Sequence, residues 1–209
     1  YQTKGKKKRG EILKDLKEDD LTTINNILST TLATKERIPN YSTIFQKIFK
    51  ITGNPKSIID LGCGLNPVSI PYMKLPSLKY LCYDIDESDI DFLNRVFKKI
   101  KINGKAEILD ARDLDKLKDL PKVDIIFMFK LYDLIVPKAK KEKKLGEEII
   151  NLLMTKTNNL VVSFATKTLT RRSMKLPRRI GFEMMLDRNQ LKYELIETDN
   201  EIYYVISKK

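Results

Sequence analysis

A glycine loop directly after an apolar run is the first stretch of the chain that could do chemistry. The segment IIDLGCGLNP (58–67) ends its apolar run at Asp60 and then places Gly62 and Gly64 around Cys63. Glycine has no Cβ, so this backbone can turn sharply and approach a ligand closely. In a parallel α/β sheet, ligands bind beyond the carboxyl ends of the strands, where this loop is expected. A Gly-x-Gly turn also occurs in tight loops that bind nothing, so the loop alone does not establish a site.

Acidic residues follow at the ends of the next two expected strands. Asp84 ends the segment YLCYD, about twenty residues after the glycine loop, and a carboxylate there can accept both hydroxyls of a ribose. Asp110, in EILDARDL, is placed to accept a hydrogen bond from an adenine amino group. Each of Asp84, Asp86 and Asp110 could instead be a loop aspartate that favours a turn. Their order at successive strand ends favours a nucleoside ligand.

The chain contains no histidine. This excludes Ser-His and Cys-His nucleophile pairs and most zinc sites, so we expect no metal. The two cysteines, Cys63 and Cys82, do not indicate a disulfide framework and favour a reducing, cytoplasmic location. No apolar run approaches the roughly 20 residues that span a bilayer, and the start YQTKGKKKRG has no signal-peptide pattern. We expect a monomer without membrane contact.

Positive charge dominates the composition, with 40 Lys+Arg against 28 Asp+Glu and a formal net charge of +12. Such a balance favours a polyanionic partner, above all nucleic acid, although a solvated lysine-rich surface is the alternative. Two basic clusters, at 138–144 and 171–179, are expected beyond carboxyl ends of strands, where they could neutralise phosphates. The stretch KGKKKR (4–9) is expected to be a flexible basic arm. The predicted RNA-binding residues in these clusters are Lys138, Lys140, Lys141, Arg171, Arg172, Arg178 and Arg179.

Alternating strands and helices would position these residues. Apolar periodicity predicts helices over 11–31, with a break near 19–20, and over 40–52, before the punctuation Gly53-Asn54-Pro55. The pattern thus divides the chain into a helical N-terminal extension (1–54), with a basic tail and two or three helices, and an α/β domain (55–209). Strands are expected at 57–61, 78–85, 105–110, 123–129, 159–165, 191–199 and 201–209, and helices from Pro67, at 87–101, at 143–156 and after Pro177. This order implies a mostly parallel sheet covered on both faces and closed by an antiparallel hairpin.

The motifs, in this order, resemble those of class I S-adenosylmethionine (SAM)-dependent methyltransferases. IIDLGCG resembles the family's first motif, YDID its ribose-binding motif and LDARDL its adenine-side motif. Position 67 is proline, so the third glycine of a dinucleotide-binding G-x-G-x-x-G is missing. The resemblance covers about 56–209 and implies a Rossmann-like fold. It implies a seven-stranded, mostly parallel sheet with an antiparallel last strand, SAM as cofactor and S-adenosylhomocysteine as product.

Longer strings narrow the resemblance. ATKERIP, GCGLNPVSIPYM, YDIDESDIDFLN, DIIFMFKLYDLI and LVVSFATKTL are similar, in this order, to segments of the aminoglycoside-resistance 16S rRNA methyltransferases. Those enzymes methylate guanine N7 in small-subunit rRNA, which implies ribosomal RNA or the small ribosomal subunit as partner. Guanine N7 has an in-plane lone pair and no proton, so its attack on a sulfonium methyl group needs no general base. Catalysis can then rest on in-line positioning and electrostatics, in keeping with a chain that lacks histidine.

This resemblance implies roles for particular residues. Those predicted to bind the cofactor are Arg37 at its carboxylate, Gly62, Cys63 and Gly64 at its methionine end, Asp84 and Ile85 at the ribose, and Asp110 and Ala111 at the adenine, together with Asp60 and Lys130. Lys130, at the end of the fourth strand, is predicted beside the methyl-transfer site, and Lys167 is predicted to face RNA. Tyr132 is a candidate to stack on a flipped base. The structural alternatives are a surface position for Arg37, solvated strand ends for both lysines, and a core or rim aromatic for Tyr132.

Other activities leave different marks in a sequence. Methylation of a base amino group commonly goes with an Asn/Asp-Pro-Pro-Tyr string after the fourth strand, where this chain reads MFKLYD. Methylation of cytosine C5 needs a cysteine nucleophile, and neither cysteine is well placed. The resistance enzymes carry a larger N-terminal domain and tend to have proline at position 165, which is alanine here. These departures leave open another RNA position, a small molecule or a protein as substrate, or a non-catalytic RNA-binding or ribosome-assembly factor.

Overall fold

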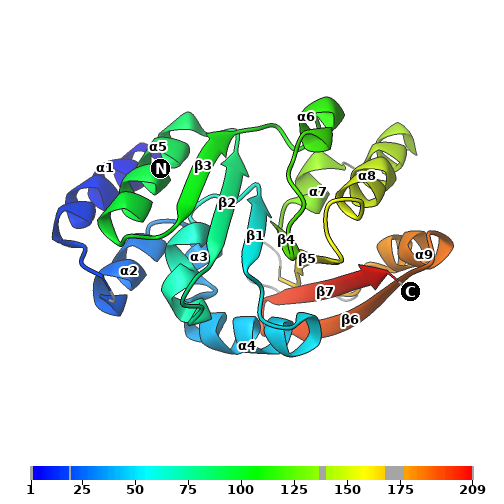
Figure 1. Cartoon of the computed structure of the whole chain (residues 1–209), viewed down its shortest axis with the longest axis horizontal. Coiled ribbons are helices and arrows are strands. Elements are labelled where there is room, and N and C mark those ends of the chain that lie inside the picture. The colour runs from blue at the N-terminus through cyan, green and yellow to red at the C-terminus, as the bar shows by residue number, and fades with distance from the viewer. Residues whose placement is uncertain (1, 19, 137–139, 168–176, 209) are drawn as a thin grey trace.

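A computed structural model describes residues 2–18, 20–136, 140–167 and 177–208. Its centre is one seven-stranded sheet in the order β3-β2-β1-β4-β5-β7-β6 (Figure 1). Strands β1 to β5 pair parallel with one another, whereas β7 pairs antiparallel with both β5 and β6. The strands are β1 Ser57–Leu61, β2 Lys79–Asp84, β3 Gly104–Ile108, β4 Ile125–Phe129, β5 Asn159–Ala165, β6 Leu191–Glu197 and β7 Glu201–Lys208. The predicted fold, a mostly parallel Rossmann-like sheet with an antiparallel last strand, is confirmed.

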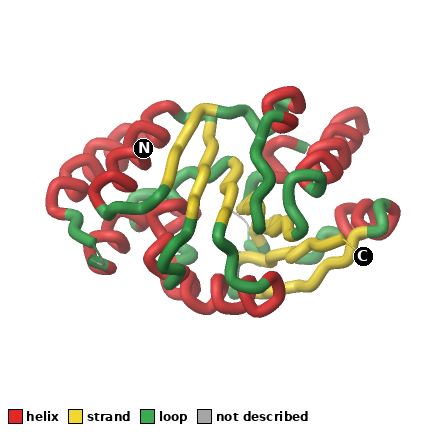
Figure 2. Tube along the Cα trace, in the orientation of Figure 1, coloured by secondary structure: helices red, strands yellow, loops and turns green. Residues whose placement is uncertain are grey.

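Helices cover both faces of this sheet (Figure 2). The α-helices are α1 Gln2–Ile12, α2 Leu21–Leu28, α3 Leu32–Lys35, α4 Tyr41–Thr52, α5 Glu87–Lys99, α6 Leu114–Lys118, α7 Tyr132–Ile135, α8 Lys140–Leu153 and α9 Ile180–Arg188. The 3-10 helices are η1 Leu13–Asp15, η2 Ile38–Asn40 and η3 Asn66–Met73. No helix in the described part of the chain has the length and apolar character that a membrane span requires.

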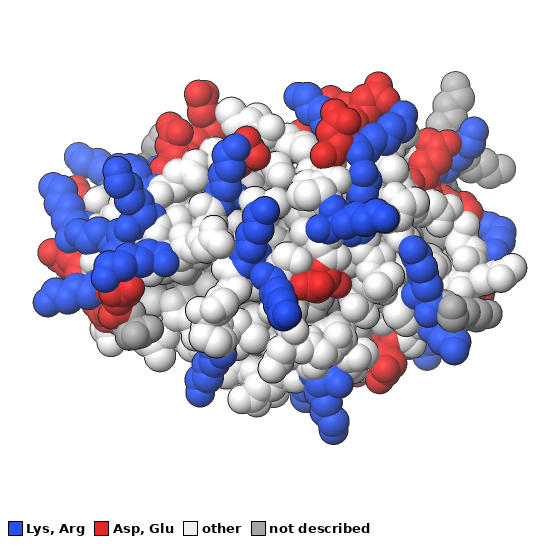
Figure 3. All heavy atoms as spheres, in the orientation of Figure 1, with Lys and Arg blue, Asp and Glu red and all other residues white. Residues whose placement is uncertain are grey.

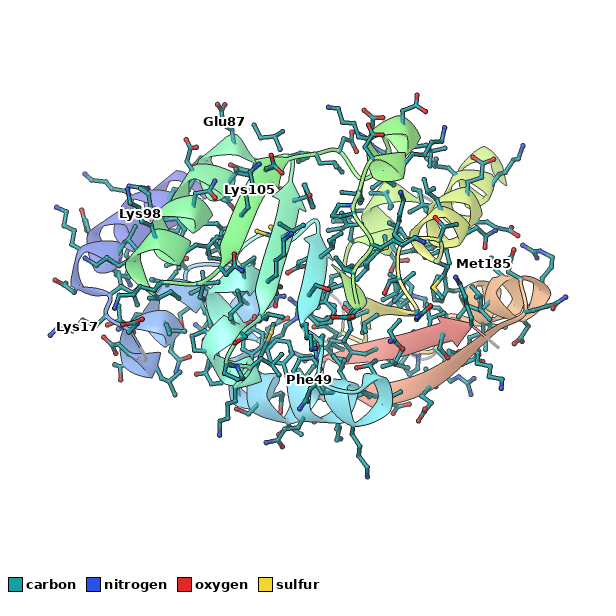
Figure 4. The ribbon with its side chains drawn as sticks, viewed as in Figure 1. Lys17, Phe49, Glu87, Lys98, Lys105 and Met185 are labelled. Carbon is teal, nitrogen blue, oxygen red and sulfur yellow. The ribbon has the colours of Figure 1, made fainter. Side chains whose placement is uncertain are left out.

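The alternation of side chains along each strand builds two hydrophobic cores. Ile58 of β1 packs on one face with apolar residues of α2, α4, η3 and α5, whereas Ile59 packs on the other with residues of α6, α7, α8 and α9. Strand β4 lies between β1 and β5 and is buried along its whole length, as expected of a central parallel strand. Phe49 lies between α4 and the sheet, whereas Lys17 and Lys98 reach outward (Figure 4). The first core thus contains residues from both sides of the predicted domain boundary at 54. The division of the chain into two domains stays a prediction.

One local expectation is refined and one is wrong. The segment predicted as a helix from Pro67 is helical, but it forms the 3-10 helix η3, in which Pro71 has no N–H to donate to an α-helical bond. Its N-cap is Leu65, and the Asn66 side chain does not cap it but bonds to Asp60. The basic stretch 4–9, expected as a flexible arm, lies within helix α1.

Helix α1 is fastened to the start of α5. Lys6 Nζ lies 2.8 and 2.7 Å from the two carboxylate oxygens of Asp86, and Arg9 Nη2 bonds to Asp89 Oδ1. The Arg9 guanidinium also lies over the Phe92 ring, 5.0 Å from its centroid. Asp86 is the N-cap of α5 and accepts from Asp89 N. The N-terminal helix therefore contacts the segment that directly follows the predicted ribose-binding residue.

Candidate functional site

The glycine loop turns at the carboxyl end of β1, where the sheet order changes from β2 on one side to β4 on the other. Gly62 and Gly64 have φ of +61° and +47°, in the left-handed region that favours glycine. A Cβ on Gly62 would lie 2.6 Å from Leu131 Cδ1, whereas a Cβ on Gly64 would meet open space within 4 Å. Gly64 N donates to Asp84 Oδ2 at 2.8 Å. The loop and the predicted ribose-binding carboxylate are therefore brought together as the sequence predicts.

The adenine-side loop is tied to the same edge. Leu109 N donates to the Asp84 carbonyl at 3.1 Å, which places Asp110 and Ala111 beside the end of β2. Ala111 is buried, while Ile85 exposes 69% of its surface as an apolar ledge. Asp110 does not stand free, because Arg112 Nη2 lies 2.7 Å from its Oδ2 and lowers the pKa of this carboxyl. A ligand amino group at Asp110 would share the carboxylate with Arg112.

Asp60 lies in a buried polar chain beneath the glycine loop. Its Oδ2 accepts from Asn66 Nδ2 and from the Tyr80 hydroxyl, both at 2.8 Å, and Asn66 Oδ1 in turn accepts from the Tyr41 hydroxyl at 3.2 Å. Oδ1 of Asp60 is buried and has no hydrogen-bond partner among the described residues. Burial raises the pKa of Asp60 to about 6, although the bonds from Asn66 and Tyr80 oppose the shift. The sequence placed Asp60 here but gave no sign of its tyrosine partner on the neighbouring strand.

Arg37, predicted to bind the carboxylate of the cofactor, is a buried member of the site. It exposes only 4% of its surface, so the alternative of a surface position is wrong. Its Nε and Nη2 donate to the two carboxylate oxygens of Glu201 at 2.9 and 2.8 Å. Its guanidinium lies over the Phe129 ring at 5.1 Å from the centroid. Residues 164 positions apart in the chain are thus fixed side by side.

Lys130 completes a cluster of charges at the ends of β4 and β7. Its Nζ lies 3.1 Å from Glu36 Oε2 and 3.4 Å from Glu201 Oε2, so it is not a solvated strand-end lysine. The cluster holds two cations, Arg37 and Lys130, and two carboxylates, Glu36 and Glu201. Burial would raise the pKa of Glu201, but the charges of Arg37 and Lys130 and the bonds it accepts hold it below its ordinary value. A formally neutral ionic cluster therefore lies at the predicted methyl-transfer edge.

Tyr132, predicted as a catalytic stacking residue, packs as a core aromatic. Its ring meets those of Phe182 and Phe164 edge-on, with centroids 4.8 and 5.8 Å apart. A Cβ on Gly146 would lie 2.5 Å from the Tyr132 hydroxyl, so α8 approaches this side chain closely. Burial raises the pKa of Tyr132 to about 12. These contacts support the structural alternative, and the stacking role stays a prediction.

Among the described basic rim residues, Arg178 and Arg179 have acidic partners within the protein. Arg178 Nε and Nη2 bond both oxygens of Glu183, at 2.8 and 2.6 Å. Arg179 bonds Asp133 Oδ2 at 3.1 Å and lies over the Phe164 ring. Lys167 is half-buried. Their role in RNA binding stays a prediction, as does that of Lys138, Arg171 and Arg172 and of the side chains of Lys140 and Lys141, which lie outside what the structure describes.

Lys and Arg also gather elsewhere on the surface. In the view of Figure 3 they are dense at the left end, over α1 and α5.

The described residues contain no group of three or more His, Cys, Asp or Glu that could hold a metal ion. Both cysteines are buried, and burial raises the pKa of Cys63 well above its ordinary value, so this thiol is protonated at neutral pH. The polar groups described at this edge are carboxylates, the cations Arg37 and Lys130, and backbone amides.

A family model described as ribosomal RNA methyltransferase (FmrO) matches residues 19–205. The chain belongs to this family. A 16S rRNA (guanine(1405)-N(7))-methyltransferase of Proteus mirabilis is 30% identical over 188 residues, and one of Micromonospora rosea is 27% identical over 184 residues. Each alignment covers 87% of this chain but only 64% of the relative. The chain thus spans less than two thirds of the length of these family members.

Solved structures agree with this membership. The structure of the 16S rRNA methylase ArmA superposes with a TM-score of 0.69 at 25% identity. The alignment covers 89% of this chain and 91% of the ArmA chain. The 16S rRNA methyltransferase RmtF, solved with S-adenosyl-L-homocysteine, superposes with a TM-score of 0.80 at 21% identity over 99% of this chain and 76% of its own. The second likeness confirms the class I methyltransferase fold.

Proposed function

We propose that the chain is a SAM-dependent RNA methyltransferase that transfers a methyl group to guanine N7 of small-subunit rRNA. The observation that carries the proposal is the bond from Gly64 N to Asp84, which closes the glycine loop onto a carboxylate at the switch point of the sheet. Membership of the rRNA methyltransferase family supports the reaction class, and the printed names of the relatives support guanine N7. We further propose that it acts as a cytoplasmic monomer on the small ribosomal subunit.

The residues at this edge fit SAM. The left-handed glycines leave open space at Gly64, the Asp84 carboxylate suits ribose hydroxyls, and the unpartnered Oδ1 of Asp60 is an acceptor that no described residue satisfies. Ile85 and Ala111 offer apolar surface for an adenine ring. When bound, SAM supplies an electrophilic methyl group on a sulfonium. Arg37, with two of its nitrogens held by Glu201, is proposed to orient the carboxylate of the cofactor.

Guanine N7 suits a site without a general base. Its lone pair lies in the ring plane and it has no proton to lose, so the new N–C bond forms as the S–C bond breaks and no residue must take a proton. Lys130 is held by Glu36 and Glu201 and serves as a fixed charge that positions the base. Protonated, buried Cys63 offers no nucleophile for attack on a pyrimidine.

Mass-spectrometric mapping tests the proposal. Purified 30S subunits are incubated with the protein and methyl-labelled SAM, and the rRNA is digested and its nucleotides identified. We expect one N7-methylguanine, and a lower yield of it at limiting SAM when Asp84 is replaced by alanine. A label on another atom would move the assignment to a different RNA modification. SAM binding without transfer to naked rRNA or either subunit would refute RNA as the substrate, and absence of SAM binding at millimolar concentration would refute the enzyme.

A further inference from the structure

Glu201, the first residue of β7, is fully buried yet charged. Four groups converge on its carboxylate: Arg37 Nε and Nη2, the Ser163 hydroxyl and Lys130 Nζ. Burying charges is costly, and a buried ion pair is often no more stabilising than apolar residues of the same volume. The stability of β7 therefore does not account for this arrangement. What the charges provide is a fixed geometry for the cations they hold.

Glu201 reaches the backbone of Lys130 as well as its side chain. Ser163 Oγ bonds Glu201 Oε1 and accepts from Lys130 N at 3.0 Å, while the Ser163 carbonyl accepts from the same N–H at 3.1 Å. Lys130 has φ of +55°, a left-handed conformation that costs a side-chain-bearing residue about 1–2 kcal/mol. Because such strain persists only where the surroundings over-determine the backbone, these bonds account for how the strained turn is held.

We propose that Glu201 is a positioning residue: through Ser163 and two ion pairs it holds Arg37 and Lys130 in one arrangement that receives the cofactor and the target base. The inference rests on the proposed function. Arg37 comes from the segment before α4 and Lys130 from the end of β4, and both are tied to one carboxylate on β7. Glu201 touches neither the cofactor nor the base in this proposal and acts through its two cations.

Glu201→Gln tests the proposal with little change of volume. It removes the negative charge and leaves Glu36 as the only carboxylate of the cluster. We expect the full chain to bind SAM about tenfold more weakly by calorimetry, the size of one lost charged hydrogen bond. We also expect single-turnover methylation of 30S subunits to slow by about tenfold or more at saturating SAM, because Lys130 is displaced as well.

Ser163→Ala is the second variant, because Glu201→Gln leaves a buried arginine partly unpaired and can prevent folding. It removes only the hydroxyl between Glu201 and Lys130 N. Its single-turnover rate should fall more than its SAM affinity, since Arg37 keeps both bonds to Glu201. Near-UV circular dichroism selects the temperature at which each variant is folded.

Glu183→Gln is the matched control. Glu183 is also a buried glutamate that holds an arginine by two nitrogens, Arg178, and accepts from a hydroxyl, that of Tyr204, but it lies on α9 away from the glycine loop. The Glu183→Gln variant should have a lower free energy of unfolding than wild type and the same affinity for SAM. The inference would be overturned if folded Glu201→Gln had the SAM affinity and the rate of wild type. If only Ser163→Ala folds, the same result in that variant would overturn it. A loss of SAM affinity in Glu183→Gln equal to that in Glu201→Gln would also overturn it. Wild-type protein that binds no SAM would instead overturn the proposed function.

Discussion

At the scale of single residues, the site depends on carboxylates whose surroundings differ sharply. Asp84 is half-buried and holds the glycine loop through Gly64 N, whereas Asp60 is enclosed and lacks a partner for one oxygen. Glu201 is enclosed too, but two cations and a hydroxyl surround it. A carboxylate on the ligand side and one beneath the loop should therefore respond differently to mutation and to pH.

Asp84→Ala should weaken SAM binding by about 1–3 kcal/mol, because the ribose hydroxyls lose a charged acceptor. Calorimetry on the full chain measures the change. Asp91→Ala is the control, since Asp91 is an exposed carboxylate on α5, five residues after its N-cap Asp86. Equal SAM affinity in wild type and Asp84→Ala would remove Asp84 from the cofactor site.

Asp60 should make the ligand-free protein less stable as pH rises. Its folded-state pKa, about 6, lies above the ordinary value of 3.8, so the folded state binds the proton more tightly. The stabilisation from the protonated form is present at low pH and is lost between about pH 4 and 6, a loss on the order of 3 kcal/mol. Urea unfolding of wild type and Asp60→Asn across this range measures it. A difference between the two proteins that does not change with pH would contradict the assignment.

At the scale of elements, helix α1 acts as a brace on α5 and not as a loose arm. Arg9 is buried against Asp89 and Phe92, and Lys6 holds the Asp86 cap. The basic residues at 4–9 suggested a flexible arm, because a sequence does not show which acidic partner neutralises a lysine or an arginine. The acidic partners of Lys6 and Arg9 lie 80 positions further along the chain.

Arg9→Ala should lower the free energy of unfolding by about 2–3 kcal/mol, somewhat less than for a fully buried pair, because Asp89 keeps some solvent access. Lys8→Ala, which removes an exposed cation from the same helix, should change it by less than about 0.5 kcal/mol. Chemical denaturation of both variants gives the comparison. Similar values for the two would show that α1 does not brace α5.

Local sequence patterns predicted most of the strands and helices. They did not predict contacts between residues that are distant in the sequence. Apolar alternation and the loop motifs located all seven strands and placed Gly62, Gly64 and Asp84 together, because those features depend on neighbours in the chain. Glu201 was missed because its bonded partner Arg37 lies 164 residues earlier in the chain. An acidic residue at the head of the apolar strand EIYYVIS was the available signal. The 3-10 form of η3 was not predicted, although Pro71, which lacks an N–H, indicated a break in α-helical bonding.

At the scale of the whole molecule, the net charge of +12 should govern association with RNA. If about six to ten phosphates are neutralised, raising salt from about 50 to 200 mM should weaken RNA binding by roughly 10³–10⁵-fold. Filter binding of rRNA fragments across this range measures the slope. The affinity for SAM should change little in the same buffers.

The double substitution Arg171→Glu with Arg172→Glu should reduce this salt slope and the methylation of subunits. Lys47→Glu with Lys50→Glu is the control with the same change of charge, on exposed positions of α4, the helix that leads into the amino end of β1. Methylation of 30S subunits that is equal in both double variants would count against an RNA-binding rim at the carboxyl edge.

The position of Glu201 also has a consequence for how the protein is made. A ribosome synthesises Arg37 early and Lys130 next, and adds β7 only after every other strand of the sheet. Until β7 emerges and pairs with β5, neither cation has its buried carboxylate and the turn at Lys130 lacks the contact that Glu201 adds through Ser163. Until β7 is in place, a nascent chain therefore lacks the buried carboxylate that holds the two cations together.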